Sequence, residues 1–224
     1  MDGLLPNVHW GEIFKALGET LAMMSVALVF AVLLAVPLGI LMYLTGKGQL
    51  RANPFVYGIV AFIVNIIRSV PFIILMIAVL PFTGLIMGTT IGVAGALPPM
   101  IIAATPFLAR LVEIALREVD HGLIELGQSM AATTRQTVIH ILLPEARPAL
   151  FAAITVTAIA LVDYTAMSGV LGGGGLGDLA IRYGYQRFQT DVMVITIAIQ
   201  ILLVQAIQYL GDRAVLRFSR SRRG

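Results

Sequence analysis

The sequence predicts an all-α polytopic membrane protein with five transmembrane helices, and three observations support that fold class. Only 12% of the 224 residues are charged, and 58% are hydrophobic. Soluble domains, by contrast, carry about 25% charged residues. Charged residues are absent from three long stretches, at residues 20–46, 69–109 and 192–211, and a helix needs about 20 apolar residues to cross a bilayer. Together these observations exclude a soluble enzyme and a disordered chain.

The five spans are predicted, in order, from these charge-free stretches and from the residues that divide them. The middle stretch is long enough for two crossings, and we divide it near Pro81, Gly84 and Gly88. The second predicted span therefore continues past Pro71. A further apolar run is interrupted only by Asp163. The predicted spans therefore cover approximately residues 20–45, 55–81, 89–110, 149–171 and 192–211.

The basic residues predict the orientation of these spans. Five crossings place the termini on opposite faces, and lysine and arginine mark the cytoplasmic face. The residues used for this assignment are Lys47, Arg51, Arg117, Arg135, Arg147, Arg213, Arg217, Arg220, Arg222 and Arg223. We expect residues 1–17 to form an external segment and residues 212–224 to form a basic cytoplasmic tail. Acidic residues precede the first span and its apolar run is long, so we expect it to remain in the mature protein.

Several classes of function are not supported by the residues present. The chain has no cysteine and a net charge of only +3, so neither a thiolate metal site nor a nucleic-acid partner is predicted. Residues 172–177 match a Gly-x-Gly-x-x-Gly pattern, but they follow a membrane span and not a strand. The three histidines lack metal-ligand spacing. We therefore expect no catalytic residues, no metal and no cofactor in this chain.

The segment of residues 111–147 is neither a span nor a tail. Its central part, residues 122–134, is a mildly apolar helix candidate with small residues at Gly127, Ser129, Ala131 and Ala132. Small residues allow the backbone of another chain to approach closely, which favours a docking role. An ordinary connection with an interfacial helix is the alternative that composition leaves open.

A resemblance to a known family favours docking. Residues 125–144 resemble the cytoplasmic signature of the permeases of ABC importers, in which Glu-Ala-Ala is followed at fixed spacing by Gly and by Ile-x-Leu-Pro. The corresponding positions in this chain are Glu125, Leu126, Gly127, Ala131, Ile141, Leu143 and Pro144, with Leu126 and Gly127 in place of the two alanines. Ala131 stands where the signature has glycine. Residues 19–23, 64–75, 106–110, 173–177 and 211–213 are similar to the permeases of methionine importers.

The resemblance implies a type I ABC importer permease fold over residues 18–209. It implies a homodimer that works with two ABC ATPase subunits, which bind ATP and Mg, and with an external methionine-binding lipoprotein. The function implied is import of methionine across the bacterial inner membrane by alternating access. Contact with the ATPase would involve Glu125, Leu126, Gly127, Ala131, Ala132, Ile141, Leu143 and Pro144.

Polar residues inside the spans are candidates for the translocation pathway. A charge at the bilayer centre costs about 2.5–3.5 kcal/mol on insertion scales, so Arg68 and Asp163 should face protein or water. Both lie roughly 20 Å along their predicted helices, and an ion pair between them is a hypothesis. Tyr164, Thr165 and Ser168 add hydroxyl groups beside them. Hydrogen bonding between helices is the alternative role for these hydroxyls.

A second function remains open at this point. An ion-coupled secondary transporter for a small amino acid would use Arg68 and Asp163 for coupling. Five spans without an internal repeat are not typical of that class.

Overall fold

The computed structural model describes residues 6–220, and this part of the chain consists of helices and their connections. The predicted external segment and basic tail extend beyond it, at residues 1–5 and 221–224. The elements are α1 (Trp10–Thr45), α2 (Pro54–Ser69), α3 (Phe72–Met87), α4 (Gly92–Arg117), α5 (His121–Ser129), α6 (Thr134–Gln136), the π-helical turn η1 (Thr137–Leu142), α7 (Leu143–Gly169), α8 (Gly175–Leu179), the π-helical turn η2 (Ala180–Tyr185) and α9 (Thr190–Arg220).

The predicted fold class is confirmed. Four helices of the described region are long and apolar enough to cross a membrane, and the pair α2 and α3 makes a fifth crossing if it counts as one span. The helices extend past the predicted spans. α1 begins ten residues before the predicted position 20. α6, η1 and α7 form one continuous helix from Thr134 to Gly169. Much of the predicted segment 111–147 is therefore continuous with its neighbouring helices.

The second predicted span is not one straight helix. α2 ends at Ser69 and α3 begins at Phe72, with an angle of 108° between them. The cause is Pro71, which has no N–H for a helical hydrogen bond and disfavours helical geometry at the residue before it. Val70 is accordingly extended, at φ −84° and ψ 124°. Arg68, which was predicted in the middle of this span, consequently lies in the last turn of α2, beside the break.

α1 is the central packing element, and small residues let it approach α4. Ala27, Ala31, Ala35 and Gly39 follow one another at intervals of four residues along one buried face. Such spacing of small side chains allows close contact between membrane helices. A Cβ atom on Gly39 would lie 2.7 Å from both the carbonyl oxygen of Ala109 and the Val112 side chain. The two helices therefore touch through their backbones.

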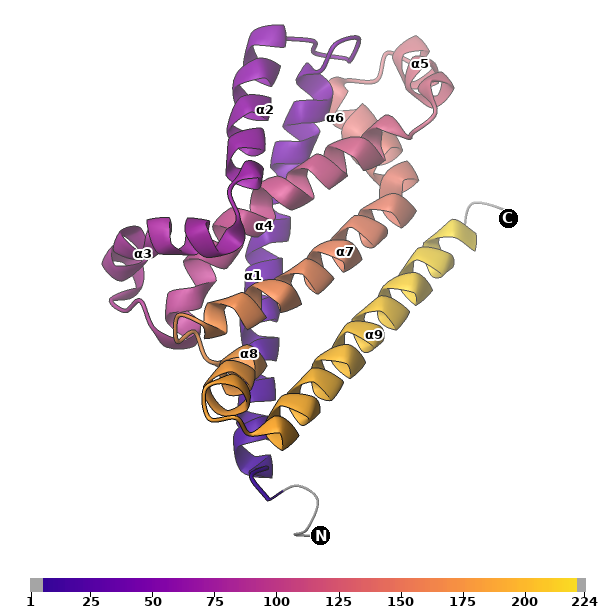
Figure 1. The fold of residues 1–224 in the computed structure, drawn as a ribbon. Helices are drawn as coiled ribbons and strands as arrows, with labels where there is room; N and C mark the ends of the chain where they lie inside the picture. The colour runs from indigo at the N-terminus through magenta and orange to yellow at the C-terminus, as the bar shows by residue number, and fades with distance from the viewer. Residues whose placement is uncertain (1–5, 221–224) are drawn as a thin grey trace.

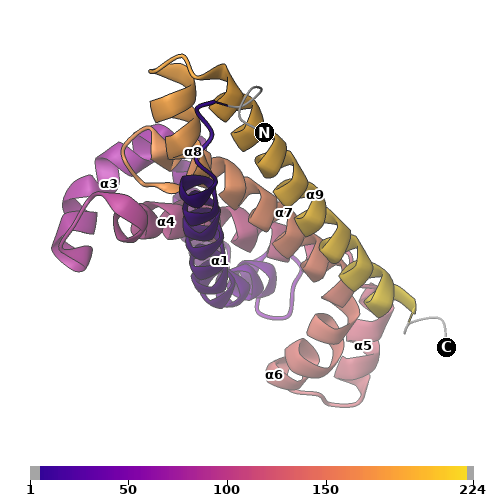
Figure 2. The ribbon, with the colours of Figure 1, turned by 90° about the horizontal axis from the view of Figure 1, so that it is seen from below.

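The molecule has two different ends (Figure 1). One, called here the α5 end, carries α5, α6 and the connection from α1 to α2. The opposite, or α8, end carries α8 and the start of α1 (Figure 2). At the α8 end the Glu19 carboxylate accepts a hydrogen bond from the Gly175 N–H at 2.8 Å, and the Thr20 hydroxyl accepts one from the Leu176 N–H at 2.9 Å. These bonds fix the glycine-rich connection of residues 172–177 to α1.

Candidate functional site

The short helix α5 stands at one end of the molecule with part of its apolar surface uncovered. Asp120 caps it by accepting a hydrogen bond from the Gly122 N–H at 2.6 Å. Ile124 and Gly127 are buried beneath the helix, whereas Leu126 is 58% exposed and Met130 is 76% exposed. At 100° per residue, these two side chains share a face with Leu123, beside the buried face. An uncovered apolar face of this kind marks a contact surface.

Gly127 allows α5 to lie directly on the turn η1. A Cβ atom at this position would be 2.7 Å from the Ile141 Cδ1 atom. Gly127 and Ile141, two residues of the cytoplasmic signature, thus meet in space, although they are 14 positions apart in the sequence. Leu143 and Pro144, also in the signature, begin α7. α5 therefore packs on the turn that leads into a long helix.

Ala131 forms the corner that follows α5. Its φ of +57° lies in the left-handed region, which costs a residue with a Cβ atom roughly 1–2 kcal/mol. The turn is closed by a hydrogen bond from the Ala132 N–H to the Gly127 carbonyl at 3.0 Å. This backbone conformation explains why the signature has glycine at this position. Glu125 is exposed on the polar side of α5.

The turn η1 widens the helix just before Pro144. The Leu143 N–H bonds to the Val138 carbonyl, five residues back. Proline provides no N–H for the next helical bond, and π-helical turns are frequent at functional sites. A cavity of about 390 Å³ adjoins this turn and is lined by Thr133, Arg135, Gln136, Ile139 and His140. The exposed face of α5 and this cavity together define a surface that we call the coupling surface.

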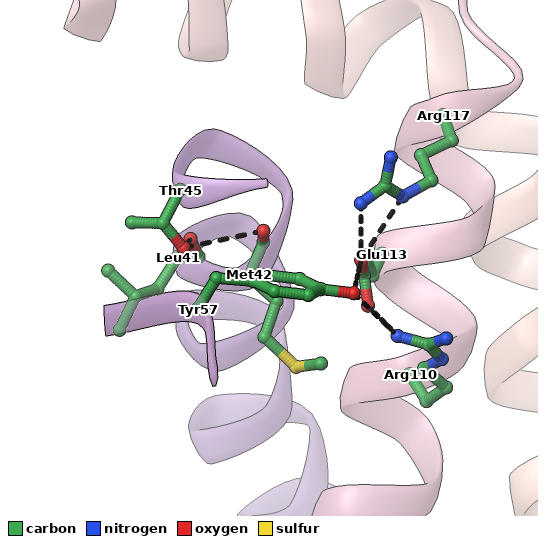
Figure 3. A network of polar contacts seen from close by, with 7 residues as sticks. All are labelled: Leu41, Met42, Thr45, Tyr57, Arg110, Glu113 and Arg117. Carbon is green, nitrogen blue, oxygen red and sulfur yellow. Dashed lines mark hydrogen bonds and ion pairs between the residues drawn. The ribbon is translucent and has the colours of Figure 1, made fainter. Parts of the chain in front are cut away.

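A buried carboxylate on α4 links this helix to α2 (Figure 3). Glu113 on α4 is 1% exposed. Its Oε2 atom accepts a hydrogen bond from Arg110 at 2.6 Å, and its Oε1 atom accepts bonds from Arg117 at 2.8 and 3.1 Å. The hydroxyl of Tyr57, on α2, donates to Oε1 at 3.2 Å and accepts from Arg110 at 3.2 Å. Two guanidinium groups and one phenol thus surround a single carboxylate.

This cluster, called the Glu113 cluster below, also contacts the end of α1. A Cβ atom on Gly46 would lie 2.7 Å from the Arg117 guanidinium, so the guanidinium lies against the backbone at the end of α1. The cluster therefore joins α1, α2 and α4 where α4 leads towards α5. From the sequence alone, Arg117 served only to orient the spans, and Glu113 was not singled out. The available signal was an acidic residue with arginines three positions before and four positions after it, which lie on one helix face.

The residues predicted for the translocation pathway are divided between different environments. Arg68 and Tyr164 line a cavity of about 210 Å³ together with Phe72 and Phe107. Asp163 lines another cavity, of about 260 Å³, together with Gln200 and Gln205 of α9. No ion pair joins Arg68 to Asp163 among residues 6–220. Asp163 and its neighbour Tyr164 face different cavities because successive residues of α7 point about 100° apart.

Thr165 and Ser168 lie in the packing between helices. Both are 0% exposed. Each hydroxyl donates to a carbonyl of its own helix, from Thr165 to Val162 at 2.7 Å and from Ser168 to Thr165 at 2.8 Å. These bonds lie within α7 and do not join it to another helix, and the pathway role of the two residues stays a prediction.

Comparisons with known proteins agree with this arrangement. Residues 35–221 match the family described as "Binding-protein-dependent transport system inner membrane component". A probable D-methionine transport system permease protein, MetI, of Vibrio cholerae is 46% identical over 92% of this chain and 91% of the relative. The methionine import system permease protein MetP of Bacillus subtilis is 48% identical over 92% of this chain and 93% of the relative.

Solved structures show the same fold. An inward-facing conformation of the MetNI methionine ABC transporter aligns with a TM-score of 0.92 and 44% identity, over 93% of this chain and 97% of that chain. An amino acid ABC transporter solved with histidines aligns with a TM-score of 0.76 at 16% identity, which is a likeness of fold alone. Sequence and helix arrangement thus agree, and the chain belongs to the inner membrane components of binding-protein-dependent transport systems, a family of multi-pass permeases.

Proposed function

We propose that this chain is the permease subunit of an ATP-driven importer that moves L- or D-methionine, or a close derivative, across the bacterial inner membrane. Two chains would form a homodimer and bind two ABC ATPase subunits, which carry the ATP and Mg. The names of the relatives support the substrate, and the MetNI structure supports the assembly. The coupling surface is the observation that carries the mechanism.

In the proposed mechanism, each ATPase subunit docks on the coupling surface at the α5 end, which lies in the cytoplasm. Closure of the ATPases on ATP displaces α5, and the Gly127–Ile141 contact passes this displacement to η1 and α7. The helices then expose the pathway alternately to the two sides of the membrane. Glu125, Ala131 and Ala132 position α5 and its corner, and no residue of this chain performs catalysis.

The α8 end lies outside the membrane in this orientation, and the C-terminus lies in the cytoplasm. A cavity of about 180 Å³ opens there among the charged side chains of Glu12, Lys15, Glu19, Asp178 and Arg182. We propose that this end receives the methionine-binding lipoprotein, which delivers the substrate.

Transport in proteoliposomes tests the proposal. Vesicles containing this chain, its ATPase and the external binding protein should accumulate radiolabelled methionine. This uptake should require ATP on the side of the membrane where the ATPase lies. Vesicles with this chain alone should show no uptake. Uptake by the chain alone, driven by a proton gradient, would replace the proposal with a secondary transporter.

Docking is tested separately by substitutions on α5. Leu126→Arg and Met130→Glu change side chains of the exposed apolar face, so both should reduce ATPase capture in a pull-down by at least tenfold. Gln128→Arg is the matched control, because Gln128 is exposed on α5 and points about 160° away from Leu126. Full capture by the first two variants would show that the ATPase docks elsewhere.

A further inference from the structure

The cavity at the break between α2 and α3 combines one cation with aromatic rings. Arg68 comes from the last turn of α2, Phe72 from the first turn of α3, Phe107 from α4 and Tyr164 from α7. The rings of Phe72 and Tyr164 are stacked, with centroids 4.3 Å apart and an interplanar angle of 10°. Four helices thus bring a guanidinium and three aromatic side chains to one cavity of about 210 Å³.

The guanidinium of Arg68 is not used by the protein itself. Within residues 6–220 it makes neither an ion pair nor a hydrogen bond, in contrast to Arg110 and Arg117. It also has no acidic neighbour in the cavity wall, since the residues that line the cavity include no aspartate or glutamate. An unpaired charge in a span is costly and marks a functional site, and the planar guanidinium suits a carboxylate.

The remaining wall of the cavity suits a thioether. Sulfur atoms of thioethers make favourable contacts with aromatic rings at about 5 Å. Broken helices are also the places where many membrane transporters form their substrate sites. A small molecule with a carboxylate at one end and a thioether at the other therefore matches both parts of the wall.

We infer that this cavity is a binding site for the transported substrate, in which Arg68 holds the carboxylate and the rings of Phe72, Phe107 and Tyr164 hold the thioether. The inference rests on the proposed function and adds Phe72 and Phe107 as residues that determine specificity. The site recognises the carboxylate and the side chain but not the ammonium group, because no acidic side chain lines it.

Three ligands test which groups are recognised. The complex of this chain with its ATPase, reconstituted in nanodiscs without the binding protein, is titrated with methionine, with methioninamide, which lacks the carboxylate, and with 4-(methylthio)butanoate, which lacks the ammonium group. Methionine and the butanoate should bind with similar affinity, and methioninamide about ten- to a hundredfold more weakly, the size expected for a lost charged hydrogen bond. Equal binding of methioninamide and methionine, or no binding of methionine, would overturn the inference.

Variants then locate the recognition. Arg68→Gln should abolish the preference for methionine over methioninamide, Arg68→Lys should restore part of it, and Phe107→Ala should weaken methionine and the butanoate together. Ser69→Ala is the matched control, because the Ser69 hydroxyl is bonded to the Asn65 carbonyl at 2.8 Å. ATPase capture by each variant confirms that it has folded. A preference that survives Arg68→Gln would mean that Arg68 only complements the helix dipole of α2.

The inference and the proposed function fail in different ways. If the wild-type complex imports methionine but Arg68→Gln keeps the carboxylate preference, the cavity is not the site and the function stands. If the wild-type complex distinguishes the carboxylate but imports no methionine, the site stands and the proposed function falls.

Discussion

Charged residues inside the spans are handled in two opposite ways in this molecule. In the Glu113 cluster a buried carboxylate meets two guanidinium groups and a phenol within 3.2 Å. Arg68 and Asp163, by contrast, line cavities and make no ion pair within the described region. A charge that the fold requires is surrounded by partners, whereas a charge without partners remains available to a ligand. The comparison therefore assigns the Glu113 cluster a structural role and leaves Arg68 and Asp163 as candidates for a functional one.

The largest effect is expected from removing the centre of the cluster. Glu113→Ala leaves Arg110 and Arg117 without their partner, but their side chains are 33% and 39% exposed, so the loss of these bonds should cost about 1–3 kcal/mol. The midpoint of thermal unfolding of the purified complex should fall sharply. Glu118→Ala is the control, because Glu118 is exposed in the same region and a surface change costs at most about 0.5 kcal/mol. Equal stability of the two variants would contradict the structural role of the cluster.

Asp163 should respond with the opposite sign. The insertion cost of its charge is about 2.5–3.5 kcal/mol. Asp163→Leu should therefore raise the free energy of unfolding by up to about 2 kcal/mol, and with it the midpoint of thermal unfolding, while methionine uptake falls. Thermal unfolding and proteoliposome uptake measure the two effects on the same preparation. A loss of stability would show that Asp163 has a partner in the assembled dimer.

A smaller change sharpens the role of the phenol. Tyr57→Phe removes one hydroxyl that donates to Glu113 and accepts from Arg110, so it should cost about 0.5–1.5 kcal/mol. Combined with Glu113→Ala, it should cost less than it does alone, because one of the two partners of the hydroxyl is already absent. Full additivity in this double-mutant cycle would mean that Tyr57 acts through packing alone.

The smallest effect is expected within α7. Thr165→Val removes a hydroxyl that bonds only to its own helix at 2.7 Å, so the change in stability should stay below about 1 kcal/mol and uptake should be unchanged. The same assays measure both. A clear loss of uptake with normal folding would return Thr165 to the translocation pathway.

The predictable parts of this molecule follow from local patterns. Charge-free stretches indicated the crossings because lipid excludes charge. The spacing of the signature in residues 125–144 indicated α5, because the helix and the turn after it each have a fixed number of residues. Pro71 was the signal for the bend, because a proline disfavours helical geometry at the residue before it, here Val70. The second span was nevertheless predicted as one helix through Pro71. A rule applied one residue at a time would have found this break.

The rest depended on contacts between distant segments. Tyr57 reaches a carboxylate 56 positions away, which no spacing within one helix can indicate. Asp163 and Tyr164 are adjacent in sequence yet line different cavities, because packing against α4 and α9 sets the rotation of α7. The hypothesis of an Arg68–Asp163 pair matched their depths but had no information on this rotation.

The bend at Pro71 also bears on how the protein is inserted during synthesis. α2 and α3 have 16 residues each, or about 24 Å of helix, less than the hydrocarbon thickness of about 30 Å. α3 buries Phe72 and Met76 in a cluster with Met100 and Ala104 of α4. We therefore expect residues 72–87 to become protease-resistant in membranes only in nascent chains that extend through residue 117, and to be cleaved in chains that stop at residue 87. Equal resistance in both would show that this half-helix integrates unaided.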